Sequence, residues 1–155
     1  MGHTVRSATY ISLTTFKRTG QPVATPVWVA PALPGVPFRP GELCFVTLAD
    51  SWKVKRLRRD PRVEVTVCDM RGRIEPGTPR YAGTARLLES PEEVRAVKRA
   101  IGNKYGAWYH AFAAAERVIA RVYPWYGTRA GIAMVLEETP VADDVVDAQG
   151  GRSTR

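Results

Sequence analysis

The chain has 155 residues, 45% of them hydrophobic and 25% charged. This length and composition indicate one soluble domain whose core needs no disulfide or metal. No apolar run approaches the roughly 20 residues of a membrane-spanning helix. Its net charge of +8 leaves nucleic-acid binding open, but five of the 23 basic side chains lie within residues 53–59, which favours one localised anion site. The N-terminus has no apolar secretory stretch and Cys44 and Cys68 lie in apolar segments, so we expect a cytoplasmic protein with free thiols.

The first two predicted strands form a hairpin. Residues 8–16 alternate so that Ile11 and Leu13 share one face, and Gly20 suits the turn that follows. Residues 22–30 resume the extended pattern. Pro26 cannot donate a ladder hydrogen bond, so we expect it at a sheet edge, at a bulge or facing a ligand.

A proline-rich loop over residues 31–41 precedes a third strand over 42–48. Asp50 or Ser51 can cap a short helix that runs to about residue 59, and Pro61 prevents its continuation. A fourth strand follows over 62–69, where valines alternate with polar residues.

The second half of the chain adds a fifth strand over residues 80–88, two helices and a last strand over 129–137. Ser90 and Glu93 form a capping box that starts the first of these helices, Gly102 and Asn103 interrupt it, and the second helix ends near Val122. We assign residues 1–138 to one domain and expect a polar, disordered tail over 139–155.

This order of elements favours an α+β fold built mainly on an antiparallel sheet. A doubly wound parallel sheet would instead alternate strands and helices throughout. Closure into a small barrel removes sheet edges. We therefore predict a split β-barrel with one short helix between strands and a C-terminal helical pair.

Common catalytic motifs are absent from the sequence. It contains no G-x-G-x-x-G, no Walker A sequence, no H-E-x-x-H and no C-x-x-C. The two histidines, His3 and His110, are too few for a histidine-rich metal site, and no serine or cysteine triad can be assembled.

The start of the short helix is the strongest candidate for binding. A strand that ends at Thr47 leads into a helix start with free backbone N–H groups, which suits an anion. Basic side chains reinforce it, with Lys53 nearest the sheet and others turned outward: Lys55, Arg56 and Arg59. The alternative is a solvated basic helix surface without a ligand. The backbone from Thr25 to Trp28 can add a proline and an aromatic ring that lies against a flat ligand.

Four segments together resemble the pyridoxamine-phosphate-oxidase-like split-barrel family, and most of all its actinobacterial deazaflavin-dependent branch: residues 13–20, 24–28, 51–63 and 83–86. The resemblance covers roughly residues 10–88. It implies a homodimer of six-stranded split barrels, an FMN-binding-type groove between the subunits, and hydride transfer from coenzyme F420 to a small organic acceptor.

The same resemblance implies roles for individual residues. Those that would hold the phosphate are Ser51, Lys53 and Arg56, and those that would line the ring are Thr25, Pro26, Val27 and Trp28. Thr47, Lys55 and Arg59 would complete the site. Relatives often have a smaller residue at the position of Trp52, so this side chain is expected to narrow the groove.

Several functional alternatives stay open at this point. FMN shares the phosphate with coenzyme F420 but lacks its anionic tail. A non-catalytic carrier of haem or another planar ligand fits the same fold, and a weak nucleic-acid binder fits the charge, although we do not expect nucleic acid as the partner. Solvent or Tyr126 could supply a proton to the reduced substrate.

Overall fold

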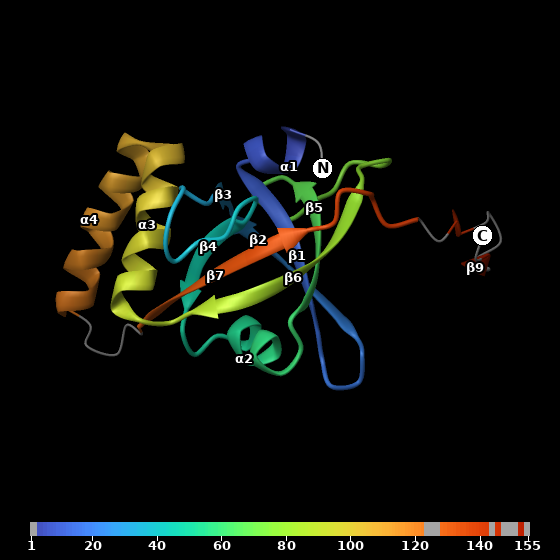
Figure 1. Cartoon of the computed structure of the whole chain (residues 1–155), viewed down its shortest axis with the longest axis horizontal. Helices are drawn as coiled ribbons and strands as arrows, with labels where there is room; N and C mark the ends of the chain where they lie inside the picture. Colours follow the sequence, from blue (N-terminus) through green and yellow to red (C-terminus); the bar gives the residue numbers. More distant parts are fainter. Residues whose placement is uncertain (1–2, 123–127, 143–144, 147–151, 154–155) are drawn as a thin grey trace.

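The computed structural model describes residues 3–122, 128–142, 145–146 and 152–153. Its centre is a curled antiparallel sheet with the strand order β2-β1-β5-β6-β7-β4-β3 (Figure 1). The strands are β1 (Tyr10–Phe16), β2 (Pro22–Trp28), β3 (Ala30–Pro31), β4 (Leu43–Leu48), β5 (Arg62–Cys68), β6 (Arg80–Leu88) and β7 (Arg129–Leu136). The helices are α1 (His3–Ser7), α2 (Trp52–Arg59), α3 (Pro91–Tyr105) and α4 (Ala107–Val122). The predicted α+β split barrel is confirmed.

The inner face of the curled sheet holds the main core, because alternate residues of each strand point inward. Ile11, Leu13 and Phe45 are among its fully buried side chains. Helix α2 covers one end of the barrel and buries Val54 and Leu57. Helix α1, which was not predicted, lies at the opposite end (Figure 1) and buries Val5 in the same core.

The outer face of the sheet is covered in part by α3, which packs its buried side chains on β4 and β7. The capping box at Ser90 is present, as predicted. The predicted interruption at Gly102 and Asn103 is wrong, since α3 continues to Tyr105 and ends at Gly106, whose φ is 60°. A glycine inside a helix costs only about 1 kcal/mol, and contacts of the last turn offset it: the Lys104 ammonium donates to the Val29 carbonyl at 2.8 Å.

The sheet is split between β2 and β4. Strand β2 is an edge strand paired only with β1, so the edge position expected for Pro26 is confirmed. On the other side of the split, β3 pairs with the start of β4 but leaves the segment from Val46 to Leu48 paired with β7 alone. Strands β2 and β4 contact each other but form no ladder of hydrogen bonds. Their facing segments are therefore available to a ligand.

The tail contains two short strands that pair with each other, β8 (Val145–Val146) and β9 (Arg152–Ser153). Residues 143–144, 147–151 and 154–155 lie outside the described residues. Before them, the backbone N–H of Val141 donates to the Arg80 carbonyl at 2.7 Å, which extends the ordered chain beyond β7. The domain boundary at residue 138 stays a prediction.

Gly83 is a position where the sheet has no room for a side chain. A Cβ there would lie 2.4 Å from the Val135 carbonyl oxygen and 2.7 Å from Leu136 Cδ2. We expect Gly83→Ala to lower the free energy of unfolding by about 1–3 kcal/mol because β7 must shift. Urea denaturation measures this loss. Thr84→Ala on the same strand, at an exposed position, should change stability by less than about 0.5 kcal/mol, and equal values for the two variants would contradict the steric argument.

Candidate functional site

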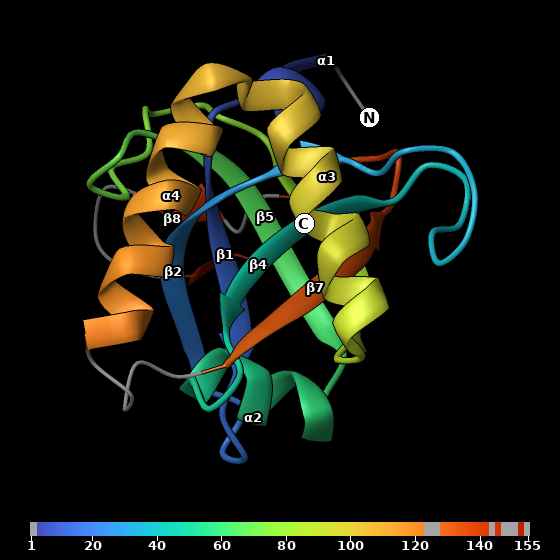
Figure 2. The ribbon, with the colours of Figure 1, turned by 90° about the vertical axis from the view of Figure 1, so that its left-hand side faces the viewer.

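A cleft of about 400 Å³ lies at the split in the sheet. Its residues come from both unpaired edges, from the start of α2, from both long helices and from the start of β7: Pro26, Val27, Trp28, Val46, Thr47, Leu48, Lys53, Ile101, Glu116 and Arg129. Figure 2 shows the side of the molecule where β2, β4 and the two long helices come together. Five of the ten predicted site residues thus line one cleft, although they come from three separate chain segments.

Trp28 forms an aromatic wall that neighbouring rings hold in place. Its ring meets Tyr10 edge-on, with centroids 6.1 Å apart, and packs against Tyr105 at 5.5 Å. The Tyr105 hydroxyl is fixed in turn, since it lies 2.6 Å from the Val29 carbonyl oxygen and donates to it. Burial raises the pKa of Tyr105 to about 12, so this hydroxyl keeps its proton. The wall is therefore pre-organised for a flat ligand.

Lys53 supplies a positive charge to the cleft from the first turn of α2. Burial lowers the pKa of its ammonium, and the positive charge of Arg56 lowers it further. Among the residues that the structure describes, none forms a hydrogen bond or ion pair with this ammonium. A half-buried lysine without a protein partner is costly. An anionic ligand would remove that cost.

Arg129 and Glu116 also line the cleft, although neither was predicted as a site residue. Arg129 begins β7 and lies opposite Leu48 in the register of β4. Its guanidinium donates to the Glu116 carboxylate of α4. Their proximity depends on how β7 pairs with β4 and how α4 docks, and no local pattern carries this information. The only signal was an arginine at the first position of a predicted strand.

Three of the other predicted residues have partners elsewhere in the protein. Arg56 donates from Nε to Thr15 Oγ1 at 2.7 Å, and Arg59 donates to the Phe16 carbonyl, so both tie α2 to the end of β1. The Lys55 ammonium lies 4.5 Å from the centre of the Trp52 ring. Trp52 is exposed and is not among the residues that line the cleft of this chain, and the narrowing of a groove between subunits by its side chain stays a prediction.

Ser51 and Thr25 are not among the residues that line the cleft, but both retain hydrogen-bonding capacity and lie within two residues of a lining residue in the sequence. Ser51 caps α2, as predicted, and its hydroxyl oxygen accepts from the Val54 N–H at 3.4 Å, which leaves its proton to donate. Thr25 Oγ1 is buried and has no hydrogen-bond partner within the described chain. An orphaned hydroxyl is rare in a native protein. Together with Lys53, these groups fit a ligand that carries a phosphate.

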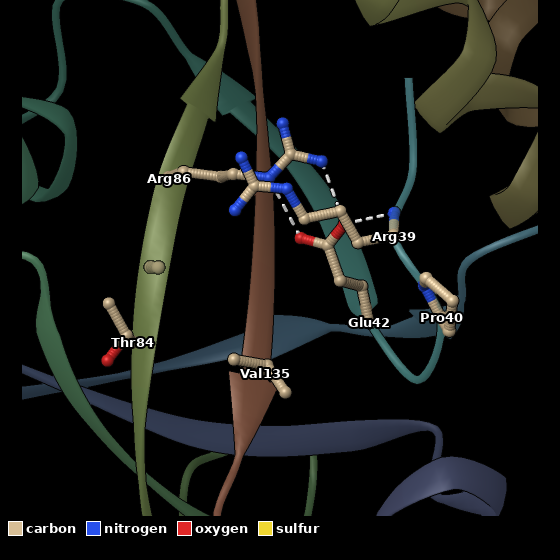
Figure 3. Close-up of a pocket in the computed structure, with 7 residues that line it drawn as sticks. Arg39, Pro40, Glu42, Thr84, Arg86 and Val135 are labelled. Carbon is tan, nitrogen blue, oxygen red and sulfur yellow. Dashed lines mark hydrogen bonds and ion pairs between the residues drawn. The ribbon is translucent and has the colours of Figure 1, made fainter. Parts of the chain in front are cut away.

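A smaller hollow of about 230 Å³ lies on the outer face of β6 and β7 (Figure 3). Arg86 and Glu42 meet there in a bidentate ion pair, with Nε and Nη2 at 3.0 and 2.7 Å from the two carboxylate oxygens. The backbone N–H of Arg39 donates to the same carboxylate at 2.5 Å. These charges are already paired within the protein, so the hollow is a weaker candidate for a ligand than the cleft at the split.

The cysteines and carboxylates offer no alternative chemistry within the described part of the chain. Both thiols are free, as expected, and Cys44 is buried while Cys68 is half-buried. Burial raises the pKa of the Cys44 thiol to about 12, and the Glu42 charge adds to this effect. No group of three histidine, cysteine or acidic side chains is placed to hold a metal, and no helix that is described could cross a membrane. Tyr126 lies outside the described residues.

The curled sheet, with a cleft and a basic helix start at its split, defines a split-barrel protein. Residues 3–138 match the family model described as pyridoxamine 5'-phosphate oxidase. The chain belongs to this family.

Solved structures with the same fold include proteins of different roles. A conserved hypothetical protein from Mycobacterium tuberculosis is 25% identical, with a TM-score of 0.56 over 86% of this chain and 76% of that one. An FMN-binding protein from Nostoc punctiforme is 16% identical, with a TM-score of 0.55 over 85% of this chain and 75% of its own. HutZ, a haem storage protein from Vibrio cholerae, is 11% identical, with a TM-score of 0.57 over 88% and 87%. No curated protein matches the sequence.

Proposed function

We propose that this protein is an oxidoreductase that uses coenzyme F420 and reduces a small, conjugated organic acceptor. The observation that carries the proposal is Lys53, a desolvated cation without a protein partner in the described chain, beside the aromatic wall of Trp28. Membership of the pyridoxamine 5'-phosphate oxidase family supports a cofactor with a flavin-like ring and a phosphate.

The charge of α2 favours the deazaflavin over FMN. Both cofactors carry a phosphate, but coenzyme F420 also carries a tail of glutamates. Lys55 and Arg59 lie on the exposed side of α2, the helix that carries Lys53. Lys55 stacks on Trp52 and Arg59 bonds to the end of β1, but their positive charges would still attract an extended polyanion, and FMN has no such tail. FMN remains the second candidate cofactor, since the Nostoc relative of the same fold binds it.

When bound, the reduced deazaflavin would supply the hydride. The protein would supply binding, orientation and exclusion of water. Lys53 and the Ser51 hydroxyl would hold the phosphate, Thr25 through Trp28 would contact the ring, and Thr47 would close the opposite edge. The raised pKa values of both thiols fit a protein whose own side chains form no covalent intermediate.

We also propose that the protein acts as a cytoplasmic homodimer with its cofactor groove at the subunit interface. The cleft is open along the split, so a second subunit could complete the side that this chain leaves uncovered. Two free thiols suit a reducing compartment. Binding of haem or nucleic acid is the competing interpretation, and the net charge of +8 alone would support it.

Titration of the full-length protein with coenzyme F420, FMN and the deazaflavin chromophore without its phosphate tests the proposal. We expect coenzyme F420 to bind most tightly and the phosphate-free chromophore to bind at least about 10-fold more weakly, because a hydrogen bond to a charged group contributes roughly 1.5–3 kcal/mol. Fluorescence of the deazaflavin reports binding directly. Equal affinity for the two deazaflavins would contradict the phosphate site, and tighter binding of FMN would assign the site to flavin.

A further inference from the structure

The cleft at the split already contains an anion, the carboxylate of Glu116. It forms an ion pair with Arg129, and both side chains are largely buried, with 22% and 18% of their surfaces exposed. Arg129 shares the cleft with Lys53. Among the described residues, two cations and one carboxylate therefore line the same cleft, where a ligand phosphate is expected under the proposed function.

The two members of this ion pair are attached to the protein very differently. Arg129 is fixed on the sheet, because β7 pairs with β4 along its length and the Thr128 carbonyl accepts from the Ala49 N–H at 2.7 Å. Glu116 belongs to α4, which packs on α3 and makes no comparably extensive contact with any described strand. Figure 1 shows α4 farther from the sheet than α3, and Figure 2 shows the two helices side by side, with α4 on the side of β2. Arg129 is therefore held by the sheet, whereas Glu116 is held by a helix with few contacts to the described strands.

We propose that Arg129 is a second anion-binding residue of the cleft and that Glu116 is the internal anion that a ligand phosphate displaces. This inference rests on the proposed function for the identity of the ligand. Lys53 and Arg129 together carry two positive charges, and Glu116 neutralises only one of them. The phosphodiester of coenzyme F420 carries one negative charge and two terminal acceptor oxygens, and the phosphate of FMN and inorganic phosphate carry −1.5 to −2 at neutral pH. Within the described chain Glu116 bonds to Arg129 and not to Lys53, whereas a ligand phosphate could accept from both cations at once.

The exchange has a defined consequence for the helical pair. Once a phosphate accepts the hydrogen bonds of Arg129, the Glu116 carboxylate loses its partner on the sheet and is repelled by the bound anion. Helix α4 would then shift away from the cleft mouth.

Glu116→Gln is the most direct test, because it removes the competing charge and keeps the shape of the side chain. We expect the variant to bind inorganic phosphate about 2- to 5-fold more tightly than the natural chain, because phosphate would no longer have to replace a partly exposed ion pair. Arg129→Gln should bind phosphate about 10-fold more weakly. Titrations followed by 15N–1H NMR measure both affinities, and thermal unfolding establishes that each variant is folded. Arg129→Lys, which keeps the charge, is the second variant if Arg129→Gln does not fold.

Glu137→Gln is the matched control, since Glu137 is exposed just beyond the other end of β7 and its loss changes the net charge equally. The control should leave phosphate affinity unchanged. In the Arg129→Gln background, Glu116→Gln should no longer tighten binding. The inference is overturned if phosphate does not bind, or if Glu116→Gln and Glu137→Gln give the same affinity. Phosphate results that follow the expectation while coenzyme F420 fails to bind would uphold the anion exchange and reject the proposed cofactor.

Discussion

Replacing Lys53 by alanine is expected to weaken binding of coenzyme F420 by about 10- to 100-fold. Lys53 is a cation that lines the cleft and has no partner within the described chain, and its interaction with a phosphate in a partly desolvated site would contribute roughly 1.5–3 kcal/mol. Affinity for the phosphate-free deazaflavin should change little, because the ring contacts stay in place. Fluorescence titration of both ligands against the natural chain and the variant measures the difference.

The same substitution should leave stability unchanged or raise it. Burial lowers the pKa of Lys53 in the folded protein, so the charged ammonium costs free energy at every pH below that lowered pKa, and alanine removes this cost. Lys17→Ala, on the exposed turn between β1 and β2, is the matched loss of one positive charge, and Lys53→Arg should retain part of the affinity. A Lys53→Ala variant that is destabilised, or that binds both deazaflavins equally less well, would give Lys53 a structural role.

The sequence was sufficient to predict the strands and the helix start that form the cleft. Alternation of valines identifies β5, and Ser51 caps α2 because a serine oxygen can accept from a free N–H of the first turn. These are local effects. The edge position of Pro26 also follows from one residue, since proline cannot take part in a central ladder.

The rest of the site depends on distances that the sequence does not encode locally. Arg56 and Arg59 follow the same helical pattern as Lys53, yet both bond to the end of β1, more than 40 residues earlier in the chain. Arg129 and Glu116 meet only because β7 pairs with β4 and α4 docks nearby. A charge pattern on a helix therefore identifies residues that could bind an anion. Only tertiary packing separates the residues that face the cleft from those that bond the helix to the rest of the protein.

Arg86→Ala is expected to cause the largest loss of stability, about 3–5 kcal/mol. It would leave the buried Glu42 carboxylate, which is 4% exposed, without its bidentate partner (Figure 3). Arg86 also donates to the Pro37 carbonyl at 2.7 Å, so the loop before β4 would lose a second anchor. For a domain of this size the midpoint of thermal unfolding should fall by on the order of 10 °C. Calorimetry and urea unfolding measure the two quantities.

The pH dependence of this loss distinguishes an unpaired charge from simple loss of packing. Burial alone would raise the pKa of Glu42, but hydrogen bonds from Arg86 and from the Arg39 backbone, with the charges of both arginines, lower it below its ordinary value of 4.5. In the natural chain Glu42 therefore stabilises the fold above pH 4.5, and this contribution is lost as the pH falls through the lowered pKa. Without Arg86 the burial effect dominates, the pKa of Glu42 rises, and protonation relieves the cost at acid pH.

The stability difference between the natural chain and Arg86→Ala should be largest near pH 7 and shrink below pH 4.5. Arg95→Ala, at an exposed position on α3, should show little difference at any pH. A difference that does not vary with pH would assign the loss to packing of the arginine side chain.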